Sequence, residues 1–201
     1  MSSPFRYFAR PHDFASHSMQ PMHCDFCGEM RLCYTGPFYG EADDMETICE
    51  ECLVSGRLAA AQLSDNEANS RELRRQLVQF RPELTAQEIE RIVRERTDEL
   101  ESRTPSPVTW QYFLWPAHCG DNCRYLKEVG QPEIIALAPD GDGPAYLLAH
   151  ADMVSDIEHA REIWEGVRPD APQDRSLAYS VGVYLFQCLV CGEHILLWDC
   201  D

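Results

Sequence analysis

The chain has 201 residues, of which 44% are hydrophobic and 25% are charged, and its formal net charge is −17 at pH 7. This is the composition of a globular protein, and a chain of this length buries enough surface to fold without disulfide bonds. The acidic excess argues against non-specific nucleic-acid binding, which depends on lysine and arginine. Its longest apolar runs, such as residues 183–186, are far shorter than the roughly 20 residues that span a membrane.

The N-terminus lacks the features of a secretory signal. Residues 1–14 contain two arginines and no continuous apolar stretch, whereas a signal peptide needs an apolar core. We therefore predict a cytoplasmic protein, in a compartment where thiols stay reduced. In such a chain the ten cysteines are expected to bind metal or carry chemistry rather than form disulfide bonds.

Most of the negative charge lies outside the central segment. Residues 64–103 hold ten acidic and eight basic residues, so the rest of the chain carries a charge of −15. Acidic clusters at residues 41–46 and 140–142 are candidate contact points for a basic protein, and equally candidate solvated loops. Arginines within residues 71–75 form a local basic patch, which leaves nucleic-acid binding as a weaker alternative.

Residues 1–63 are predicted to form an N-terminal arm and a zinc module. The aromatic side chains between residues 5 and 14 are expected to pack on the body. Residues 32–39 suit a hairpin and residues 58–63 suit a helix. A knuckle, a hairpin and then a helix is the order of a treble-clef-like zinc module, although Gly56 weakens the helical part.

Two Cys-x-x-Cys pairs predict a structural zinc site in this module. The first pair is Cys24 and Cys27, and the second, after 21 intervening residues, is Cys49 and Cys52. Two such pairs supply four thiolates to a tetrahedral zinc, and a closed set of four leaves no position for water or substrate. Gly28 permits the positive φ of a zinc knuckle. A thioredoxin-like redox role for either pair is the minor alternative.

Residues 64–103 are predicted to form two helices. Apolar residues recur at helical spacing on both sides of Pro82, which separates the helices. Thr85 and Glu88 match a capping box at the start of the second helix. Arg96 falls where the apolar stripe would continue, so this helix is expected to be only partly buried.

The C-terminal half is predicted to mix strands, turns and one helix. Residues 134–138 and 145–149 flank a Pro-Asp-Gly-Asp-Gly turn and suggest a hairpin, and residues 152–165 suggest a helix. Residues 181–200 alternate between strand and turn. We therefore expect an α+β fold in which residues 64–201 form a body packed as one unit with the zinc module, and a β-rich C-terminal segment closes a second cysteine site.

A second, long-range zinc site is predicted between the central and C-terminal segments. Its sequence signals are the His118-Cys-Gly-Asp-Asn-Cys123 run and a further Cys-x-x-Cys pair downstream. The favoured ligands are four cysteines, Cys119, Cys123, Cys188 and Cys191. Cys119 and Cys123 would share one face of a helical turn. Either His118 or His194 can replace one of the cysteines.

A catalytic thiol is the competing interpretation of the same residues. Cys119 would be a nucleophile activated by His118 and oriented by Asp121. Sequence neighbours rarely form such a pair, because catalytic cysteine and histidine usually meet through the fold. Buried structural thiols are a third alternative. Cys33 and Cys200 have no partner spacing and are expected to be core or terminal thiols.

Other catalytic templates are missing from the sequence. It contains no glycine-rich phosphate loop, no nucleophile-elbow serine and no His-Glu-x-x-His pair. The abundant carboxylates show no recognisable catalytic spacing and are expected to solvate the surface. We therefore expect no enzymatic activity.

Several sequence blocks resemble the CbrC family of small bacterial proteins, named for a colicin-tolerance member. The blocks run in the expected order and are Phe5-Arg6-Tyr7, Cys24 to Gly28, Tyr34 to Tyr39, Cys49 to Cys52, Arg103 to Pro105, Trp110-Gln111, Trp115, His118 to Cys123, Tyr184 to Cys188 and Trp198-Asp199. The resemblance implies a link to tolerance of a nuclease colicin and to immunity proteins. Residues 136–180 match no block of the family.

Two functions follow as expectations. The first is a non-catalytic, zinc-stabilised immunity or tolerance protein that neutralises a basic, nuclease-type toxin; its acidic charge would accelerate association, and no membrane partner is expected. The second is a thiol-based enzyme or a redox-responsive zinc protein that uses Cys119 and Cys123.

Overall fold

The structure, a computed structural model, describes residues 3–40, 45–170 and 179–200. Helices and short sheets alternate along the chain, which confirms the predicted α+β class. The acidic residues at 41–44, expected as contact points, lie outside the described residues. Within the described ranges, no helix combines the length and the apolar character needed to cross a membrane.

The chain forms two compact units that are not continuous in sequence. Unit 1 comprises residues 1–108, 113–124 and 188–191, and unit 2 comprises residues 109–112, 125–187 and 192–201. Unit 1 therefore holds the N-terminal cysteine module together with the central helices, which the sequence analysis assigned to two different segments. It also contains a short piece of the C-terminal segment.

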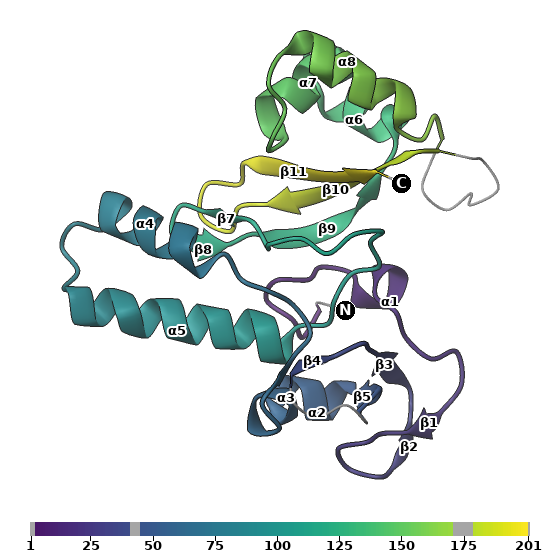
Figure 1. Ribbon diagram of the computed structural model, residues 1–201, viewed down its shortest axis with the longest axis vertical. Helices are drawn as coiled ribbons and strands as arrows, with labels where there is room; N and C mark the ends of the chain where they lie inside the picture. The colour runs from purple at the N-terminus through teal and green to yellow at the C-terminus, as the bar shows by residue number, and fades with distance from the viewer. Residues whose placement is uncertain (1–2, 41–44, 171–178, 201) are drawn as a thin grey trace. The chain divides into compact units, whose positions relative to one another are not determined.

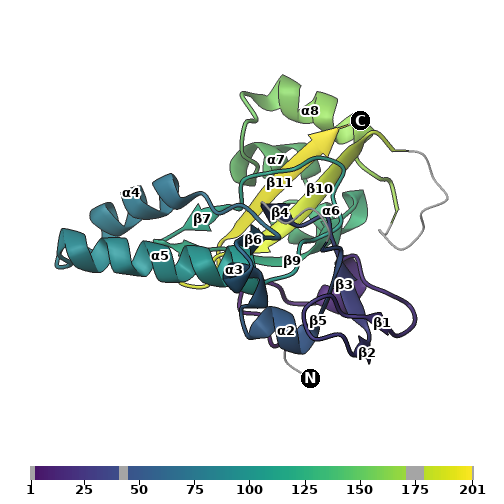
Figure 2. The same cartoon turned by 60° about the horizontal axis from the view of Figure 1, so that its bottom comes forward.

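Short strands and helices build the N-terminal part of unit 1 (Figures 1 and 2). These elements are α1 (Pro11–Phe14), β1 (Met22–His23), β2 (Met30–Arg31), β3 (Cys33–Thr35), β4 (Tyr39–Gly40), β5 (Thr47–Cys49), α2 (Glu50–Val54), α3 (Arg57–Ala60) and β6 (Leu63–Ser64). The strands pair antiparallel as β1 with β2, β3 with β5, and β4 with β6. Such short pairs bury little by themselves and depend on their packing within the unit.

The N-terminal arm packs into unit 1, as the aromatic pattern predicts. Phe5, Tyr7 and Phe8 are each at most 2% exposed, while Phe14 is half-buried. The Phe5 ring meets the ring of Tyr34, on β3, edge-on at 5.7 Å between centroids. Buried aromatic area of this kind is what holds an arm without long strands or helices in place.

Two antiparallel helices, α4 (Ser70–Phe80) and α5 (Ala86–Arg103), lie side by side in unit 1 (Figures 1 and 2). Both hydrogen bonds of the predicted capping box between Thr85 and Glu88 are present. The hairpin of β7 (Ala117–His118) and β8 (Asp121–Asn122) follows. The helices share a buried apolar cluster of Leu73, Leu77, Ile89 and Val93.

A three-stranded sheet forms the centre of unit 2, with strand order β11–β10–β9. Its strands are β9 (Arg124–Val129), β10 (Val181–Gln187) and β11 (His194–Cys200). The middle strand, β10, is buried along residues 181–186, which explains its continuous apolar run. Three helices, α6 (Gln131–Leu137), α7 (Gly143–His150) and α8 (Ile157–Gly166), lie on one face of the sheet (Figure 1). Residues 181–200 are strand and turn, as predicted.

Two helices replace the hairpin expected at residues 134–149, so that prediction is wrong. Glu133 accepts a hydrogen bond from the N-terminal backbone of α6, and Asp142 does the same for α7. Short apolar runs do not by themselves distinguish a strand from a buried helix, and these caps decide in favour of helices. The following helix, α8, begins at Ile157 rather than near residue 152, because Asp156 is its N-cap.

Candidate metal centres

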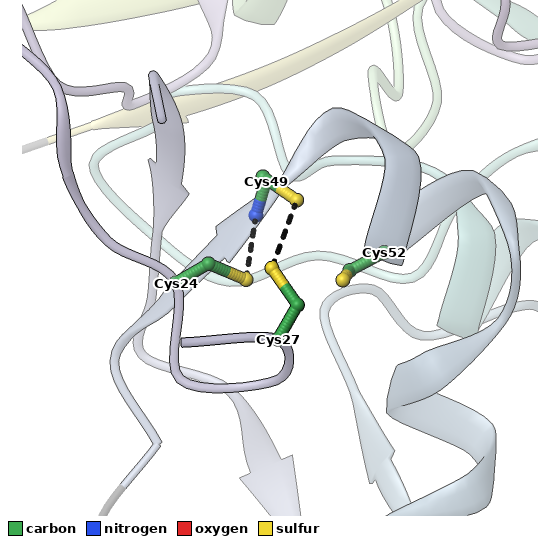
Figure 3. Close-up of side chains that lie close together, drawn as sticks. All are labelled: Cys24, Cys27, Cys49 and Cys52. Carbon is green, nitrogen blue, oxygen red and sulfur yellow. Dashed lines mark hydrogen bonds between the residues drawn. The ribbon is translucent and has the colours of Figure 1, made fainter. Parts of the chain in front are cut away.

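Four cysteines of the N-terminal module converge in unit 1 (Figure 3). Cys24 and Cys27 lie in the turn between β1 and β2, whereas Cys49 ends β5 and Cys52 lies in the first turn of α2. All four Sγ atoms lie within 4.8 Å of one another, and those of Cys27 and Cys49 are 4.0 Å apart. The four residues predicted for this site therefore form one cluster that can hold a metal ion.

Local backbone contacts bring the two pairs together. The N–H of Gly28 donates to the carbonyl of Cys24 at 2.7 Å, and Gly28 has a φ of +73°, a conformation that glycine adopts without strain. The Asp25 carboxylate accepts hydrogen bonds from the backbone N–H groups of Glu46 and Thr47 at 2.9 and 2.8 Å. The turn with the first cysteine pair is thereby joined to the strand that leads to the second.

The thiols of this cluster differ in acidity. Burial opposes ionisation of Cys24, but backbone N–H groups, that of Cys49 among them at 3.3 Å, lower its pKa to about 7. Burial raises the pKa of Cys52. It also raises the pKa of Cys33, which is 1% exposed beside the cluster, to about 11. The Cys24 thiol therefore ionises near neutral pH. A bound cation would displace the protons of the other cysteine thiols in the cluster.

A second group of ligand atoms lies elsewhere in unit 1. His118 ends β7, Cys119 follows it in the hairpin turn, and Cys188 and Cys191 lie between β10 and β11 in the short segment that belongs to this unit. Their four ligand atoms lie within 4.8 Å of one another. The Nδ1 atom of His118 is 3.4 Å from the Sγ atoms of both Cys119 and Cys191. This group can also hold a metal ion.

The Cys188-x-x-Cys191 pair forms a turn like that of Cys24-x-x-Cys27. Backbone N–H groups of Val190 and Cys191 approach the Sγ of Cys188 at 3.4 and 3.5 Å. Gly192 has a φ of +78°, close to that of the corresponding Gly28. The repeated Cys-x-x-Cys-Gly signal therefore corresponds to a repeated local geometry.

Cys123 was predicted as a ligand but is not among the four groups that converge. The residues from His118 to Cys123 form a tight hairpin rather than the expected helical turn, with positive φ at Cys119 and Gly120. Cys123 is fully buried and its carbonyl accepts a hydrogen bond from the indole of Trp115 at 2.7 Å. His118 takes the fourth place, which was one of the substitutions the sequence left open.

The remaining predicted residues lie outside both clusters. His194, the other histidine considered as a ligand, belongs to unit 2, and its Nδ1 is 2.9 Å from the hydroxyl of Tyr146. Cys33 is a core thiol, as expected, and Cys200 is exposed at the end of β11. Chain order alone does not distinguish His118 from His194, because each is next to a cysteine pair.

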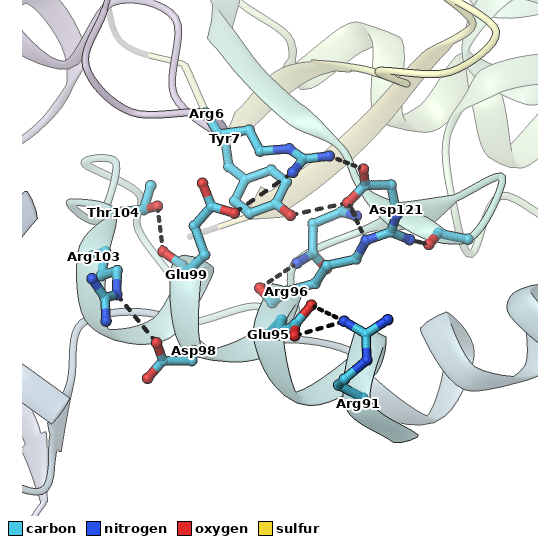
Figure 4. A network of polar contacts seen from close by, with 12 residues as sticks. Arg6, Tyr7, Arg91, Glu95, Arg96, Asp98, Glu99, Arg103, Thr104 and Asp121 are labelled. Atoms are coloured by element: carbon cyan, nitrogen blue, oxygen red, sulfur yellow. Dashed lines mark hydrogen bonds and ion pairs between the residues drawn. The ribbon is translucent and has the colours of Figure 1, made fainter. Parts of the chain in front are cut away.

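A network of charged side chains holds the hairpin that carries His118 and Cys119 (Figure 4). Asp121 on β8 is 2% exposed, and its carboxylate accepts hydrogen bonds from Tyr7 at 3.0 Å and from Arg6 at 2.5 Å. Arg96 of α5 donates to the carbonyl of Gly120 and lies 3.4 Å from the same carboxylate. This explains the position of Arg96, which sequence analysis noted only as an interruption of an apolar stripe.

Gln76 of α4 holds the same hairpin from the other helix. Its Oε1 accepts the N–H of Gly120 at 2.9 Å, and its Nε2 donates to the carbonyl of Ala117 at 2.8 Å. Gln76 is 5% exposed. The sequence does not identify Gln76 as a residue that holds the hairpin, because a glutamine within a helix has no distinctive local pattern. Backbone groups on both sides of the two ligands are therefore held by α4 and α5.

The surroundings of Cys119 do not favour the catalytic alternative. Burial, followed by the neighbouring thiols of Cys191 and Cys188, raises the pKa of Cys119 to about 12. Asp121, expected to orient His118, is bound instead by Tyr7 and Arg6. A reactive cysteine needs a lowered pKa and a positive environment. The geometry fits a ligand of a metal better than a nucleophile.

The model of an uncharacterised protein family, UPF0167, matches residues 3–200. The chain belongs to the UPF0167 family. The identification as a CbrC family protein is therefore wrong, and UPF0167 replaces it.

Two curated relatives of the chain come from mycobacteria. UPF0167 proteins of Mycobacterium bovis and Mycobacterium tuberculosis are each 27% identical to the chain over 204 residues, which covers 97% of this chain and 91% of the relative. No solved structure matches the chain. The residues matched by the family model include those of both cysteine clusters.

Proposed function

We propose that this UPF0167 protein is a non-catalytic binding protein stabilised by two structural zinc ions, and that its partner is a basic protein. The observation that carries the proposal is the convergence of two complete four-ligand sets, one of four cysteines and one of three cysteines and a histidine. Thiolate and imidazole are the donors that zinc prefers, and four of them close its coordination sphere.

The spacing of the ligand atoms supports zinc. Tetrahedral bonds of about 2.3 Å to sulfur place two sulfurs about 3.8 Å apart, and the Sγ atoms of Cys27 and Cys49 are 4.0 Å apart. A shorter bond to nitrogen places nitrogen and sulfur roughly 3.6 Å apart, close to the 3.4 Å between His118 Nδ1 and Cys191 Sγ. These two distances support zinc binding at both clusters.

We include a treble-clef-like form of the first centre in this proposal. The first cysteine pair lies in the turn between β1 and β2, and the second lies at the start of α2. This order of knuckle, strands and helix supports the assignment, although α2 is short.

The partner class is proposed from charge. The net charge of −17 favours a basic protein by accelerating its association. A nuclease-type toxin is one protein of this class, and the acidic charge of the chain is the observation that supports it. The partner isolated at low ionic strength should be basic, and its association rate should fall steeply with salt. An acidic partner, or a rate that salt does not change, would contradict this part of the proposal.

Metal content tests the zinc centres directly. Protein purified without added metal should contain two zinc ions per chain by elemental analysis, and native mass spectrometry should show one fewer in Cys52→Ser and in Cys188→Ser. The matched controls, Cys33→Ser and Cys123→Ser, remove neighbouring thiols that are not in the clusters and should keep both ions. Loss of one zinc in Cys123→Ser would restore Cys123 as a ligand, and a metal-free wild type would refute the proposal.

A thiol-based function of Cys119 is the second candidate. The observation in its favour is the 3.4 Å contact between Cys119 Sγ and His118 Nδ1. It requires that Cys119 in the folded, metal-loaded protein reacts with iodoacetamide much faster than the other thiols. Uniformly slow alkylation, measured residue by residue by mass spectrometry, would exclude it.

A further inference from the structure

A cavity of about 430 Å³ lies in unit 1 beside the first metal centre. Cys49, a ligand of that centre, is part of its lining, together with Leu32, His12 and the carboxylates of Glu50 and Glu51. Leu32 is 55% exposed, and the side chain of Glu50 is 44% exposed. The cavity thus combines an apolar wall, an imidazole ring and accessible carboxylates next to a cluster of thiols.

Charge in this cavity favours a cation. A zinc ion with four thiolate ligands carries a net charge of about −2, and Glu50 and Glu51 add to it. The one arginine among the lining residues, Arg31, is already paired with Glu29 at 2.6 Å and with Glu51 at 2.9 Å. Its charge is therefore neutralised locally, and the carboxylate of Glu50 is the acceptor best placed for a ligand.

The shape of the lining favours a planar cation on an apolar stem. The His12 ring lies over that of Tyr34 with centroids 6.3 Å apart and planes within 22°, which leaves a flat imidazole at the cavity. The hydroxyl of Tyr34 contacts Glu50 Oε2 at 3.5 Å, and His12 Nε2 lies 3.7 Å from the same oxygen. Guanidinium groups stack on flat rings and bind carboxylates through two parallel hydrogen bonds.

We propose that this cavity binds an arginine side chain of the basic partner, with its guanidinium on Glu50 and its methylene stem against Leu32. The inference rests on the proposed function, because the zinc-loaded cluster supplies part of the negative charge. A lysine would gain the same charge attraction but not the stacking or the paired hydrogen bonds. The cavity therefore defines a specific contact point within a generally acidic protein.

The test is a titration of the zinc-loaded full chain, followed by NMR, with N-acetyl-arginine methylamide as the probe. N-acetyl-citrulline methylamide, which has the same shape without the charge, is the matched control ligand. Shifts of resonances near His12 and Leu32 should saturate with the arginine probe, and the citrulline probe should bind about tenfold more weakly. Equal binding of the two probes, or no binding by the arginine probe, would overturn the inference.

Variants locate the site. Glu50→Gln should weaken binding of the arginine probe about tenfold, whereas Glu95→Gln, which removes an exposed carboxylate on α5, should leave it unchanged. An equal loss in both variants would assign binding to the overall charge and overturn the inference. Zinc content is measured in every sample. If the chain contains two zinc ions but does not bind the arginine probe, the cavity assignment alone is refuted. If the chain contains no zinc, the proposed function is refuted.

Discussion

Asp65 is a carboxylic acid in the interior of unit 1. It is 4% exposed, and its Oδ2 accepts a hydrogen bond from the backbone N–H of Ser106 at 2.9 Å. Burial raises its pKa to about 7, and this hydrogen bond offsets only part of the cost of burying the charge. At neutral pH the folded protein therefore holds a carboxyl group that is only partly ionised.

Replacing Asp65 by asparagine is expected to stabilise the protein at high pH. The folded-state pKa lies above the ordinary value of 3.8, so the folded state binds the proton more tightly, and stability falls as the pH rises from about 4 to about 7. Asp65→Asn lacks this titration. The free energy of unfolding of Asp65→Asn minus that of the wild type should increase by about 2 kcal/mol between pH 5.5 and pH 8. Denaturant titration at each pH measures both values.

Glu67→Gln is the control for this prediction, since Glu67 is exposed in the same segment. Because Asp65 is intact in this variant, its stability should still fall as the pH rises from about 4 to about 7. If Asp65→Asn and the wild type show parallel pH profiles, the carboxyl group of Asp65 titrates normally and the prediction is wrong.

At the scale of elements, the β7–β8 hairpin depends on two helices for its position. Gln76 of α4 and Arg96 of α5 both bind the backbone of Gly120, which directly follows Cys119. Cys119 and Gly120 have φ values of +53° and +78°, as in a type I′ turn, but a hairpin with strands of two residues has little stability by itself. The helices thus position the candidate metal ligands His118 and Cys119 from outside the cluster, a role that in other metal sites affects affinity strongly.

Arg96→Gln is expected to weaken zinc binding at the second centre by about tenfold while the first centre keeps its affinity. Competition with a chromophoric chelator measures both sites in one protein, so the first centre serves as an internal control for folding. Arg91→Gln is the matched variant, because Arg91 lies on the same helix but pairs with Glu95 at the surface. A similar loss in both variants, or none in Arg96→Gln, would show that the contact has no positioning role.

At the scale of the whole molecule, both metal centres belong to unit 1. The elements that carry the first centre are short, and its longest strand has three residues. Unit 2 has instead a continuous apolar core between its sheet and its helices. Small elements without such a core commonly need a metal to fold, so the two units should respond differently to metal removal.

Removal of zinc with a strong chelator should therefore lower the protection of backbone amides against hydrogen exchange mainly in unit 1. Amides of residues 47–53 should exchange much faster, whereas those of residues 183–185, in the centre of the unit 2 sheet, should keep most of their protection. Readdition of zinc should restore the first set. Equal loss in both regions would show that the metal stabilises the molecule as one cooperative structure.

Predictions from local sequence patterns are confirmed where neighbouring residues alone determine the backbone conformation. The capping box at Thr85, the break at Pro82 and the turn at Gly28 each depend on neighbouring residues, and each lies where predicted. The prediction of a hairpin at residues 134–149 is wrong, because its apolar runs fit a strand or a helix equally well. The side chains of Glu133 and Asp142 cap helices at these positions.

The turns of Cys24-x-x-Cys27-Gly28 and Cys188-x-x-Cys191-Gly192 follow from local backbone preferences, and the spacing of the cysteine pairs was enough to predict two clusters. The fourth ligand atom of the second cluster depends instead on long-range contacts. His118 and Cys123 lie on opposite arms of one hairpin, and which of them faces Cys188 and Cys191 depends on contacts with α4, α5 and the N-terminal arm. Those contacts join residues more than 20 positions apart, so no local pattern contains them.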